Sequence, residues 1–360
     1  MAENFSFAEL VIPGTFIRVR VEGLIGVGGI STGNIGIVGT ASAGVGDETH
    51  ILSNYEEARA RFGSYDAYAA GAGTLNLTRG LEVLFRNGAK LVYARALAVN
   101  AATQADYTAA FSELVKDEVN ILVAPQLSTS TALAVFGPIL ETAENDGKDM
   151  MAVIGSDAAE VDDIVAQVTA NDRIIMTTPG VRAFDATASI DVSLSGTYGA
   201  AAVAGLLSTL SPQSSPTNKV LPGVVNLTHR FSYGEIRQLV SSRMMVLEER
   251  QGVRVVRGLT TDDGAFTQVT TRRITDFAKA GIRKASNPFI GRLNNQRVRK
   301  ALQGAIDGFL TTMVQDEALI GYSLEVTATR ADEIAGRAIV NAVIQPTFSI
   351  DFIAVTLVLE

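Results

Sequence analysis

A glycine-rich segment is the first stretch of this sequence whose residue types suggest chemistry. A dinucleotide-binding turn needs the spacing Gly-x-Gly-x-x-Gly between a strand and a helix, because backbone N–H groups must approach the pyrophosphate. Here Gly26 and Gly28 are followed by Ser31 at the third position. Gly36 and Gly39 fall inside a predicted strand with no helix directly after it. The pattern favours a flexible connection and a close-packed strand, and no cofactor is expected.

The side chains that ordinarily act as nucleophiles or metal ligands are scarce. The chain has no Cys, which excludes a thiolate metal site, a cysteine nucleophile and a disulfide scaffold. Its two histidines, His50 and His229, have no Ser and Asp pattern around them, and the Gly-x-Ser-x-Gly motif is absent. The Asp262-Asp263-Gly264 sequence is typical of a turn. No catalytic or metal-binding residue is therefore predicted, and we expect the chain not to be an enzyme.

Charge is distributed unevenly along the chain. The formal net charge is −8, yet residues 229–300 contain 15 Lys and Arg against 6 Asp and Glu, which leaves the remainder strongly acidic. Such asymmetry is typical of an oriented molecule with an anionic partner on one side. Nucleic acid, membrane lipid and an acidic protein all fit this description, and charge alone does not choose among them.

The basic region contains residues with helical spacing. Arg292, Gln296, Arg299 and Gln303 fall at i, i+4, i+7 and i+11, and two further basic residues lie close by. The basic members of this strip are Arg292, Arg297, Arg299 and Lys300. Aromatic residues that would stack on bases are not interleaved with them, so an acidic protein surface is the favoured partner. The alternative is an ordinary solvated helix face.

Strands and helices alternate through most of the chain. The 360 residues are 47% hydrophobic and 19% charged, which is ample for a packed core and for about two domains. Strands are predicted at 35–38, 91–94, 121–124, 151–154 and 173–176, and helices at 75–86, 105–115, 131–144 and 160–169. This alternation predicts a doubly wound α/β domain. The longest weakly polar run, 198–210, is too short to span a bilayer, and no secretory signal is seen.

The last third of the sequence changes character. Ser232 and Glu235 form a capping box that opens a helix carrying Leu239 and Leu247 on its apolar face. A strand is predicted at 253–258, and Asn287-Pro288 predicts the start of a long helix. The apolar stripe predicted for that helix is Leu302, Ile306, Phe309, Leu310 and Met313. Strands at 323–329 and 347–359 are expected to close the chain.

Both ends of the chain carry apolar strand patterns without obvious local partners. Near the start the alternating residues are Phe16, Ile17, Val19 and Val21, and near the end they are Ile353, Val355, Leu357 and Leu359. An apolar strand with an open edge invites pairing with another chain. We therefore interpret both ends as candidate inter-subunit arms.

The order of several segments resembles the contractile tail sheath family, which comprises phage tail sheaths and the sheaths of related contractile injection systems. The segments that carry the resemblance are 12–18, 34–41, 58–63, 85–95, 199–206, 252–261, 269–274 and 287–322. The match is strongest in the C-terminal part, where Gly252-Val-Arg-Val-Val-Arg-Gly-Leu-Thr-Thr261 precedes the Val269–Ile274 sequence.

The resemblance implies an outer doubly wound α/β domain inserted into an inner α+β domain that is built from both chain ends and extended by terminal β-arms. The corresponding divisions are residues 1–22 for the N-terminal arm and first inner strand, and 23–230 for the outer domain with its Gly-rich connection 23–46. Residues 231–345 would form the inner domain that faces the lattice and tube, and 346–360 the C-terminal arm.

The resemblance also implies a structural function. Such a subunit polymerises by strand exchange into a helical tube around an acidic inner tail tube, and contracts to drive that tube through a target envelope. Its other partners would be baseplate and tail terminator proteins, with no direct nucleic acid and no membrane insertion. The expected location is a virion tail or contractile particle assembled in the bacterial host cytoplasm. The basic strip would grip the tube through weak, screened pairs.

Two other readings of the sequence stay open at this point. The alternating elements are also compatible with a doubly wound nucleotide-binding enzyme, and the basic region 229–300 with a nucleic-acid-binding protein.

Overall fold

The computed structural model describes residues 29–46, 48–64, 76–98, 102–185 and 189–358. The predicted arm residues Phe16, Ile17, Val19 and Val21 therefore lie outside the described residues, and so does Leu359.

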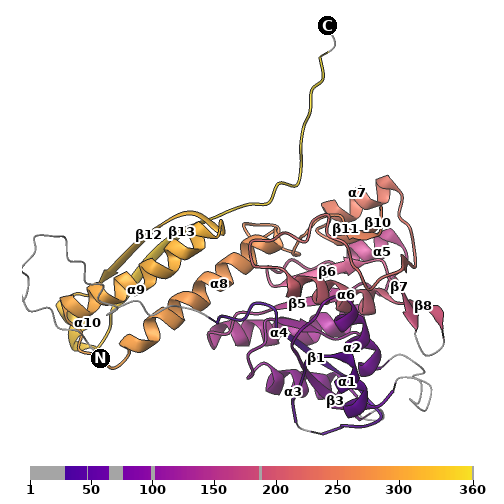
Figure 1. Cartoon of the computed structure of the whole chain (residues 1–360), viewed down its shortest axis with the longest axis horizontal. Coiled ribbons are helices and arrows are strands. Elements are labelled where there is room, and N and C mark those ends of the chain that lie inside the picture. The colour runs from indigo at the N-terminus through magenta and orange to yellow at the C-terminus, as the bar shows by residue number, and fades with distance from the viewer. Residues whose placement is uncertain (1–28, 47, 65–75, 99–101, 186–188, 359–360) are drawn as a thin grey trace, which may run out of the picture.

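An eight-stranded sheet, in the order β11-β10-β6-β5-β4-β1-β3-β2, organises most of the molecule (Figure 1). Its six inner strands run parallel, while β2 and β11 are antiparallel edges. The strands are β1 (Ile35–Thr40), β2 (His50–Leu52), β3 (Val92–Leu97), β4 (Ile121–Val123), β5 (Met151–Gly155), β6 (Ile174–Thr178), β10 (Met245–Glu249) and β11 (Val253–Val255). The five strands predicted for residues 35–176 are confirmed as β1, β3, β4, β5 and β6.

Helices cover both faces of this sheet, as expected for strands that are apolar on both sides. One face packs against α1 (Tyr55–Phe62), α2 (Leu77–Arg86) and α6 (Gly196–Thr209). The other packs against α3 (Gln104–Leu114), α4 (Thr129–Asn145), α5 (Val161–Ala166) and α7 (Tyr233–Ser241). A small sheet of β7 (Val181–Asp185), β8 (Ile190–Leu194) and β9 (Asn226–Leu227) adjoins this sheet-centred unit.

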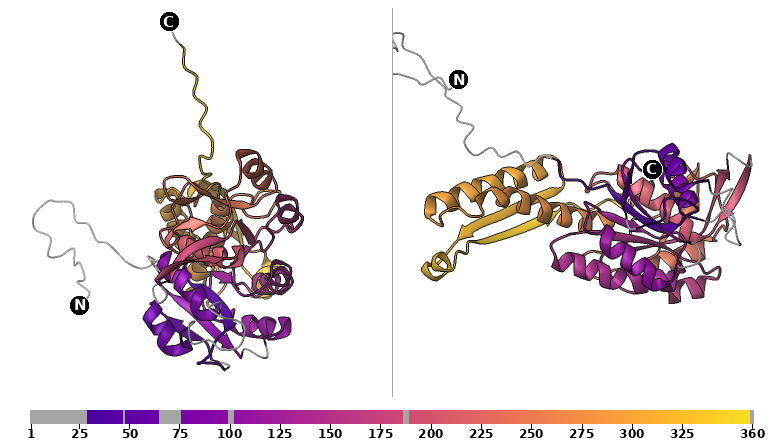
Figure 2. Two further views of the ribbon diagram at one scale, coloured as in Figure 1. Left: turned by 90° about the vertical axis from the view of Figure 1, so that its right-hand side faces the viewer. Right: turned by 90° about the horizontal axis from the view of Figure 1, so that it is seen from below.

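Residues 269–346 form an elongated projection with its own core (Figure 2). It contains α8 (Val269–Ser286), the 3-10 turn η3 (Asn287–Phe289), α9 (Gln296–Gln315), β12 (Leu319–Thr327), α10 (Arg330–Ile334) and β13 (Ile339–Pro346). The predicted stripe Leu302, Ile306, Phe309, Leu310 and Met313 is buried between the helices and the β12–β13 hairpin. We call this part the projecting unit.

Several predictions for the last third were wrong. Asn287 follows the end of α8, a helix that was not predicted, and the long helix begins later, where the Asn295 side chain accepts the backbone N–H of Val298. Leu247 lies in β10 rather than in the helix opened by Ser232. Residues 347–358 are extended but pair with no strand of the described chain, so the final strand is β13.

The division predicted between residues 230 and 231 falls within the sheet-centred unit, because α7, β10 and β11 all follow it. β10 pairs with β6 and α7 packs on the same face as α5. The chain leaves the sheet-centred unit between Val255, the end of β11, and Val269, the start of α8.

Helix α8 is attached to the sheet-centred unit by a network of ion pairs centred on Arg173. The Arg173 side chain is 3% exposed, and its guanidinium lies 2.6 Å from the Glu144 carboxylate of α4 and 3.0 Å from Asp149. It also pairs with Asp276 of α8 at 3.1 Å. A buried guanidinium needs such partners, because an unpaired charge out of water costs several kcal/mol, of order 3–5 when one partner is removed.

Three cations of α8 also belong to the network of ion pairs around Arg173, which we call the joint network. Arg272 pairs with Asp172 at 2.7 Å and with Asp276 at 2.5 Å. Lys279 and Arg283 both reach Asp149, at 2.5 and 2.6 Å. The joint network thus consists of Glu144, Asp149, Asp172, Arg173, Arg272, Asp276, Lys279 and Arg283. It fixes both the position and the rotation of α8, because Asp149, Arg173 and Asp276 each have two or more partners in the network.

Two carboxyl groups of the joint network have opposite pKa shifts. Hydrogen bonds from Arg173 and Lys279 lower the pKa of Glu144 from 4.5 to about 2. Burial raises the pKa of Asp276 above its ordinary value, although Arg272 and Arg173 oppose that effect. Protonation of Glu144 at low pH therefore weakens its ion pairs with Arg173 and Lys279, whereas protonation of Asp276 removes the free-energy cost of burying its charge.

Gly281 tests the packing of α8 on α9. A Cβ added at this position would lie 1.9 Å from Cζ of Phe309, so Gly281→Ala must displace a buried ring. We expect the variant to lose about 1–3 kcal/mol of unfolding free energy in urea titrations followed by circular dichroism. The matched control is Gly304→Ala in α9, where the added Cβ meets nothing within 4 Å and should stabilise the helix by about 0.5–1 kcal/mol. Equal stability of Gly281→Ala and wild type would contradict the packing described.

Glu144 gives the joint network a measurable pH dependence. Its folded-state pKa lies below its unfolded value, so its stabilisation is present above about pH 4.5 and is lost as the pH falls towards 2. Glu144→Gln should therefore be less stable than wild type near pH 6, and the difference should close between pH 4.5 and 2. The difference between the two proteins is the quantity to measure, because Asp276 titrates in both. Glu141→Gln, an exposed change on the same helix outside the network, is the control and should have the stability of wild type near pH 6.

Candidate assembly surfaces

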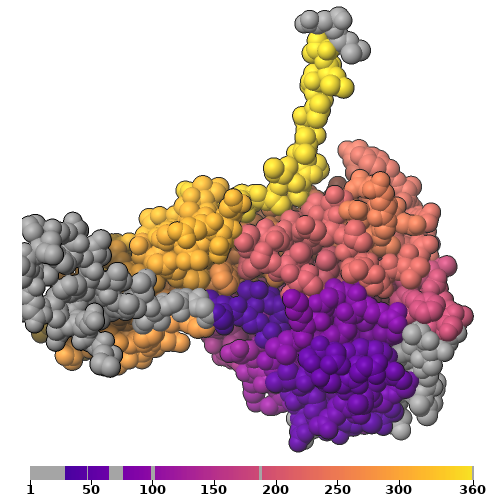
Figure 3. Space-filling model, in the orientation of Figure 1, coloured from indigo at the N-terminus to yellow at the C-terminus, as the bar shows by residue number. Residues whose placement is uncertain are grey.

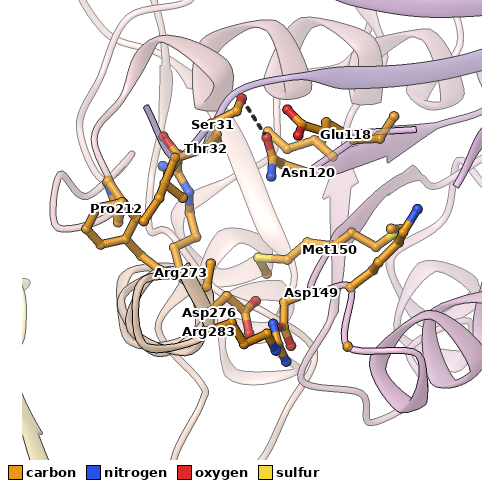
Figure 4. Close-up of a pocket in the computed structure, with 18 of the residues that line it drawn as sticks. Ser31, Thr32, Glu118, Asn120, Asp149, Met150, Pro212, Arg273, Asp276 and Arg283 are labelled. Carbon is orange, nitrogen blue, oxygen red and sulfur yellow. Dashed lines mark hydrogen bonds and ion pairs between the residues drawn. The ribbon is translucent and has the colours of Figure 1, made fainter. Parts of the chain in front are cut away.

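A cavity of about 640 Å³ lies where α8 meets the amino ends of β4 and β5 (Figure 4). Arg273, Asp276 and Arg283 of α8 line one side of it, and Asn120, which accepts a hydrogen bond from Ser31, lines the other. Nucleotides in open α/β sheets bind at the opposite, carboxyl end of the strands. Among the residues described, no group of three or more His, Cys, Asp or Glu is placed to hold a metal ion.

Arg273 connects three parts of the molecule beside this cavity. Its guanidinium donates to the backbone carbonyls of Thr32, Leu210 and Ser211, at 3.2, 2.8 and 3.4 Å. Desolvation lowers the pKa of Arg273 to about 10, so the side chain still carries its charge at neutral pH. The residue therefore links α8 to the segment before β1 and to the loop after α6, and its role is structural.

The glycines of β1 have the packing role predicted for them. A Cβ at Gly36 would lie 2.4 Å from Leu114 of α3, and one at Gly39 would lie 3.1 Å from Leu77 of α2. Helices approach the strand on both sides because these side chains are missing. Gly26 and Gly28 lie outside the described residues.

The two histidines lie apart, and neither joins a catalytic arrangement in the described chain. His50 contacts the Arg61 guanidinium on the surface, and burial together with that positive charge lowers its pKa. His229 stacks edge-on against Phe231. No helix within the described ranges has the length and apolarity to cross a membrane.

The predicted basic strip lies at the free end of the projecting unit, but it is not one helix face. Arg292 precedes the N-cap of α9 and stacks over the Phe289 ring at 5.1 Å. Arg297 is exposed in the first turn of α9, and the exposed Lys300 donates to Gln303 at 3.2 Å. Arg292, Arg297 and Lys300 therefore present their charges to solvent.

Arg299 has a different role from its neighbours in the strip. Its guanidinium lies 3.0 Å from Glu333 of α10 and 2.8 Å from the Asn294 side chain, and it is only 15% exposed. The Asn294 amide in turn donates to the carbonyl of Arg337. Arg299 thus holds α10 against the start of α9.

The same end of the projecting unit carries residues that sequence reasoning missed. α10 and the turn after it bring Arg330 and Arg337 beside the strip, and Ile290, Leu293 and Ile334 are exposed there. We call this surface, from residues 289–300 and 330–337, the basic tip. Exposed apolar residues rimmed by charge are typical of a protein-binding site. In the sequence, Ile290 and Leu293 shortly after Asn287-Pro288 were the signal that could have indicated this surface. Their position beside α10 depends on tertiary structure.

The β12–β13 hairpin is a two-stranded sheet whose two outer edges are unpaired within the described chain. Its inward residues, including Leu324, Val326 and Val340, pack on the helices. Its outward face exposes Ile320, Val343 and Ile339. An isolated pair of strands with open edges is a site at which further strands can add.

The C-terminal arm, residues 347–358, leaves the molecule beside this hairpin and extends away from it (Figure 3). Ile353, Val355 and Leu357 are all exposed. A run of exposed apolar residues in an extended segment is unfavourable in water unless another surface covers it.

Comparison with known proteins identifies two family models along the chain. The phage tail sheath protein central domain matches residues 100–261, and the phage tail sheath C-terminal domain matches residues 261–360. None of the curated proteins compared with the chain matches it.

Solved structures share the fold over nearly the whole chain. The contracted helical sheath of the anti-feeding prophage is 20% identical, with a TM-score of 0.74 over 97% of this chain and 99% of that one. The contracted sheath complex of the extracellular contractile injection system PVC is 16% identical, with a TM-score of 0.73 over 97% and 98%. The sheath tail protein of Desulfitobacterium hafniense is 13% identical, with a TM-score of 0.68 over 93% and 100%.

Sheath proteins are structural components rather than enzymes. The two family models together span residues 100–360. On this basis the chain belongs to the contractile tail sheath protein family, and it is a structural sheath subunit.

Proposed function

We propose that the chain polymerises into a helical tube around an inner tail tube and contracts to drive that tube through a target envelope. The observation that carries this proposal is the exposed apolar arm of residues 347–358 beside a two-stranded sheet with open edges. Within the described residues of one molecule, nothing covers the apolar side chains of the arm, and no strand pairs with the outer edges of the β12–β13 sheet. In a polymer, the arm of one subunit would pair with the sheet edge of the next.

The arms would act by strand addition to the β12–β13 sheet of a neighbouring subunit. Backbone hydrogen bonds give such an addition its affinity, and alternating side chains give it register. The residues proposed for this contact are Phe16, Ile17, Val19 and Val21 in the N-terminal arm, and Ile353, Val355, Leu357 and Leu359 in the C-terminal arm. A contact of this heterologous kind continues from subunit to subunit and builds an open helical assembly.

The basic tip would face the inner tube. Arg292, Arg297 and Lys300 would contact an acidic surface through solvent-exposed pairs, each worth about 0–1 kcal/mol. The exposed face of α9 beside them carries Gly304 and Gly308, which have open space around them and would allow close approach. Many weak ion pairs suit a contact with the inner tube that forms in one state of the sheath and breaks in another.

The domain arrangement proposed for this function is an outer α/β unit inserted into an inner unit made from both chain ends. In support, Ile30 packs with the core of the projecting unit although it precedes β1. We place the second boundary between Val255 and Val269, where the chain leaves the large sheet. The inner unit would then comprise the N-terminal segment, the projecting unit and the arms.

Contraction would be a repacking between two stable arrangements rather than a chemical step. Chains with this fold occur in the contracted helical sheath and in a baseplate structure of the anti-feeding prophage. We propose that this chain likewise contacts baseplate and tail terminator proteins in a virion tail or contractile particle, and that assembly takes place in the bacterial host cytoplasm.

Removal of residues 353–360, the outer part of the C-terminal arm, tests the proposal directly. We expect the chain ending at residue 352 to remain folded but to form no sedimentable polymer, while the full chain forms tubes visible by electron microscopy. The control is the full chain with Ile190→Asp, which changes an exposed apolar residue of β8 instead. Tubes formed equally well without the arm would refute strand exchange at this end.

Charge reversal tests the basic tip. Arg292→Glu combined with Arg297→Glu should leave polymerisation intact and weaken co-sedimentation with the inner tube several-fold, with the wild-type interaction itself declining as salt rises. Arg237→Glu on the exposed surface of α7 makes the same kind of charge change and should have no effect. Arg299 is left unchanged, because its loss would free Glu333. Unaltered tube binding by the double variant would show the tip to be merely solvated.

A further inference from the structure

Asp351 interrupts the exposed arm with a buried polar contact. Its carboxylate accepts hydrogen bonds from Arg257 Nε at 2.7 Å and from Gln268 Nε2 at 3.3 Å. The Thr217 hydroxyl donates to its other oxygen, also at 3.3 Å. The Asp351 side chain is 5% exposed, so these contacts are shielded from water on most sides.

The partners of Asp351 belong to three different segments. Thr217 lies in the loop after α6 and also accepts the backbone N–H of Gly258. Arg257 follows β11, and Gln268 is the N-cap residue of α8. The Gln268 side-chain carbonyl in turn accepts the backbone N–H of Ser349 at 3.2 Å. The arm is therefore fastened at the place where the sheet-centred unit and the projecting unit meet.

Burial along this part of the arm is the reverse of what hydrophobicity alone would produce. Ile350, Phe352 and Ile353 are 80%, 79% and 83% exposed, while the aspartate between them is buried. The hydrophobic effect would bury the apolar residues and leave the carboxylate in water. The segment is instead held by polar contacts, and its apolar side chains are directed outward. Even the Phe352 ring, with the Arg257 guanidinium 5.2 Å from its centre, stays exposed.

We propose that Asp351 is the positioning residue of the C-terminal arm: it fixes the point at which the arm leaves its own subunit and presents residues 352–358 to a second copy of this chain. The inference rests on the proposed strand exchange and adds a cause to it. An arm fixed at its base samples fewer conformations, so less conformational entropy is lost when its far part pairs with a neighbour. A charge-assisted hydrogen bond in a shielded site supplies the fixation.

Substitution at both ends of the Arg257–Asp351 contact tests this inference. We expect Asp351→Ala and Arg257→Ala each to raise the critical concentration for polymerisation about tenfold, measured by sedimentation of the full chain. The double variant should be little worse than either single one, because both remove the same contact. Asp263→Ala is the control, since that carboxylate is exposed in the turn before α8. The melting temperature of the unassembled subunit should change little in the single variants.

A spectroscopic measurement separates positioning from general stability. The chain has no Cys, so spin labels on Ile353→Cys and Ser241→Cys are the only labels in the dilute, unassembled subunit. We expect a bounded distance distribution with Asp351 present and a clearly broader one in the Asp351→Ala background. Equal widths, or polymerisation of Asp351→Ala at the wild-type critical concentration, would overturn the inference.

These results are distinguishable from failure of the proposed function. Suppose that the full chain polymerises, that loss of residues 353–360 abolishes polymerisation, and that Asp351→Ala has no effect. The proposal of strand exchange is then retained, and the positioning role of Asp351 is refuted. If the chain ending at residue 352 polymerises as well as the full chain, the proposed role of the arm itself is refuted, and the arm then needs no positioning residue.

Discussion

Buried charges at the start of α8 determine how the two units of this protein are oriented. Arg173 is surrounded by carboxylates from α4, from the loop before β5 and from α8, and Asp149 receives cations from two turns of α8. An apolar contact tolerates sliding, whereas ion pairs between shielded groups hold only when each charge meets its partners. The rotation and the axial position of α8 are therefore specified together, and the hairpin carried by α9 inherits that orientation.

The two units differ in how far the edges of their sheets are left open to pairing with another strand. In the sheet-centred unit the parallel strands are covered by helices on both faces, and its edges are the short strands β2 and β11, of three residues each. The projecting unit exposes both edges of β12–β13 and, nearby, an extended apolar arm. The first unit is complete as a single molecule, while the second has the features of a polymer component.

Sequence periodicity predicted the parts of the fold that are held by apolar packing. The strands β1, β3, β4, β5 and β6 and the stripe of α9 follow from apolar residues at the period of each element. Helix α8 escaped prediction because much of its buried surface is charged: Arg272, Arg273 and Asp276 have partners about 60 to 240 residues away in the sequence. No local pattern reports such partners.

The candidate surfaces were predictable to a similar extent. Residues 229–300 do carry an excess of positive charge, but Arg272, Lys279 and Arg283 belong to the joint network and Arg273 binds backbone carbonyls, and only the last part of the segment reaches the basic tip. Arg299 had the right spacing for the strip, yet the Glu333 that neutralises it is brought there by the hairpin. The apolar character of the C-terminal arm was visible in the sequence, whereas its departure from the joint depends on the contacts of Asp351.

The location of the arm's base links the fold to movement. Gln268 stands at the N-cap position of α8, and its side chain hydrogen-bonds Ser349 and Asp351, so the helix that orients the projecting unit and the segment that begins the arm share one residue. A change in the angle between the two units would therefore move the base of the arm with it. In a lattice joined by the proposed arms, a reorientation that repacks the joint network of one subunit would be transmitted to its neighbour through the backbone of the arm.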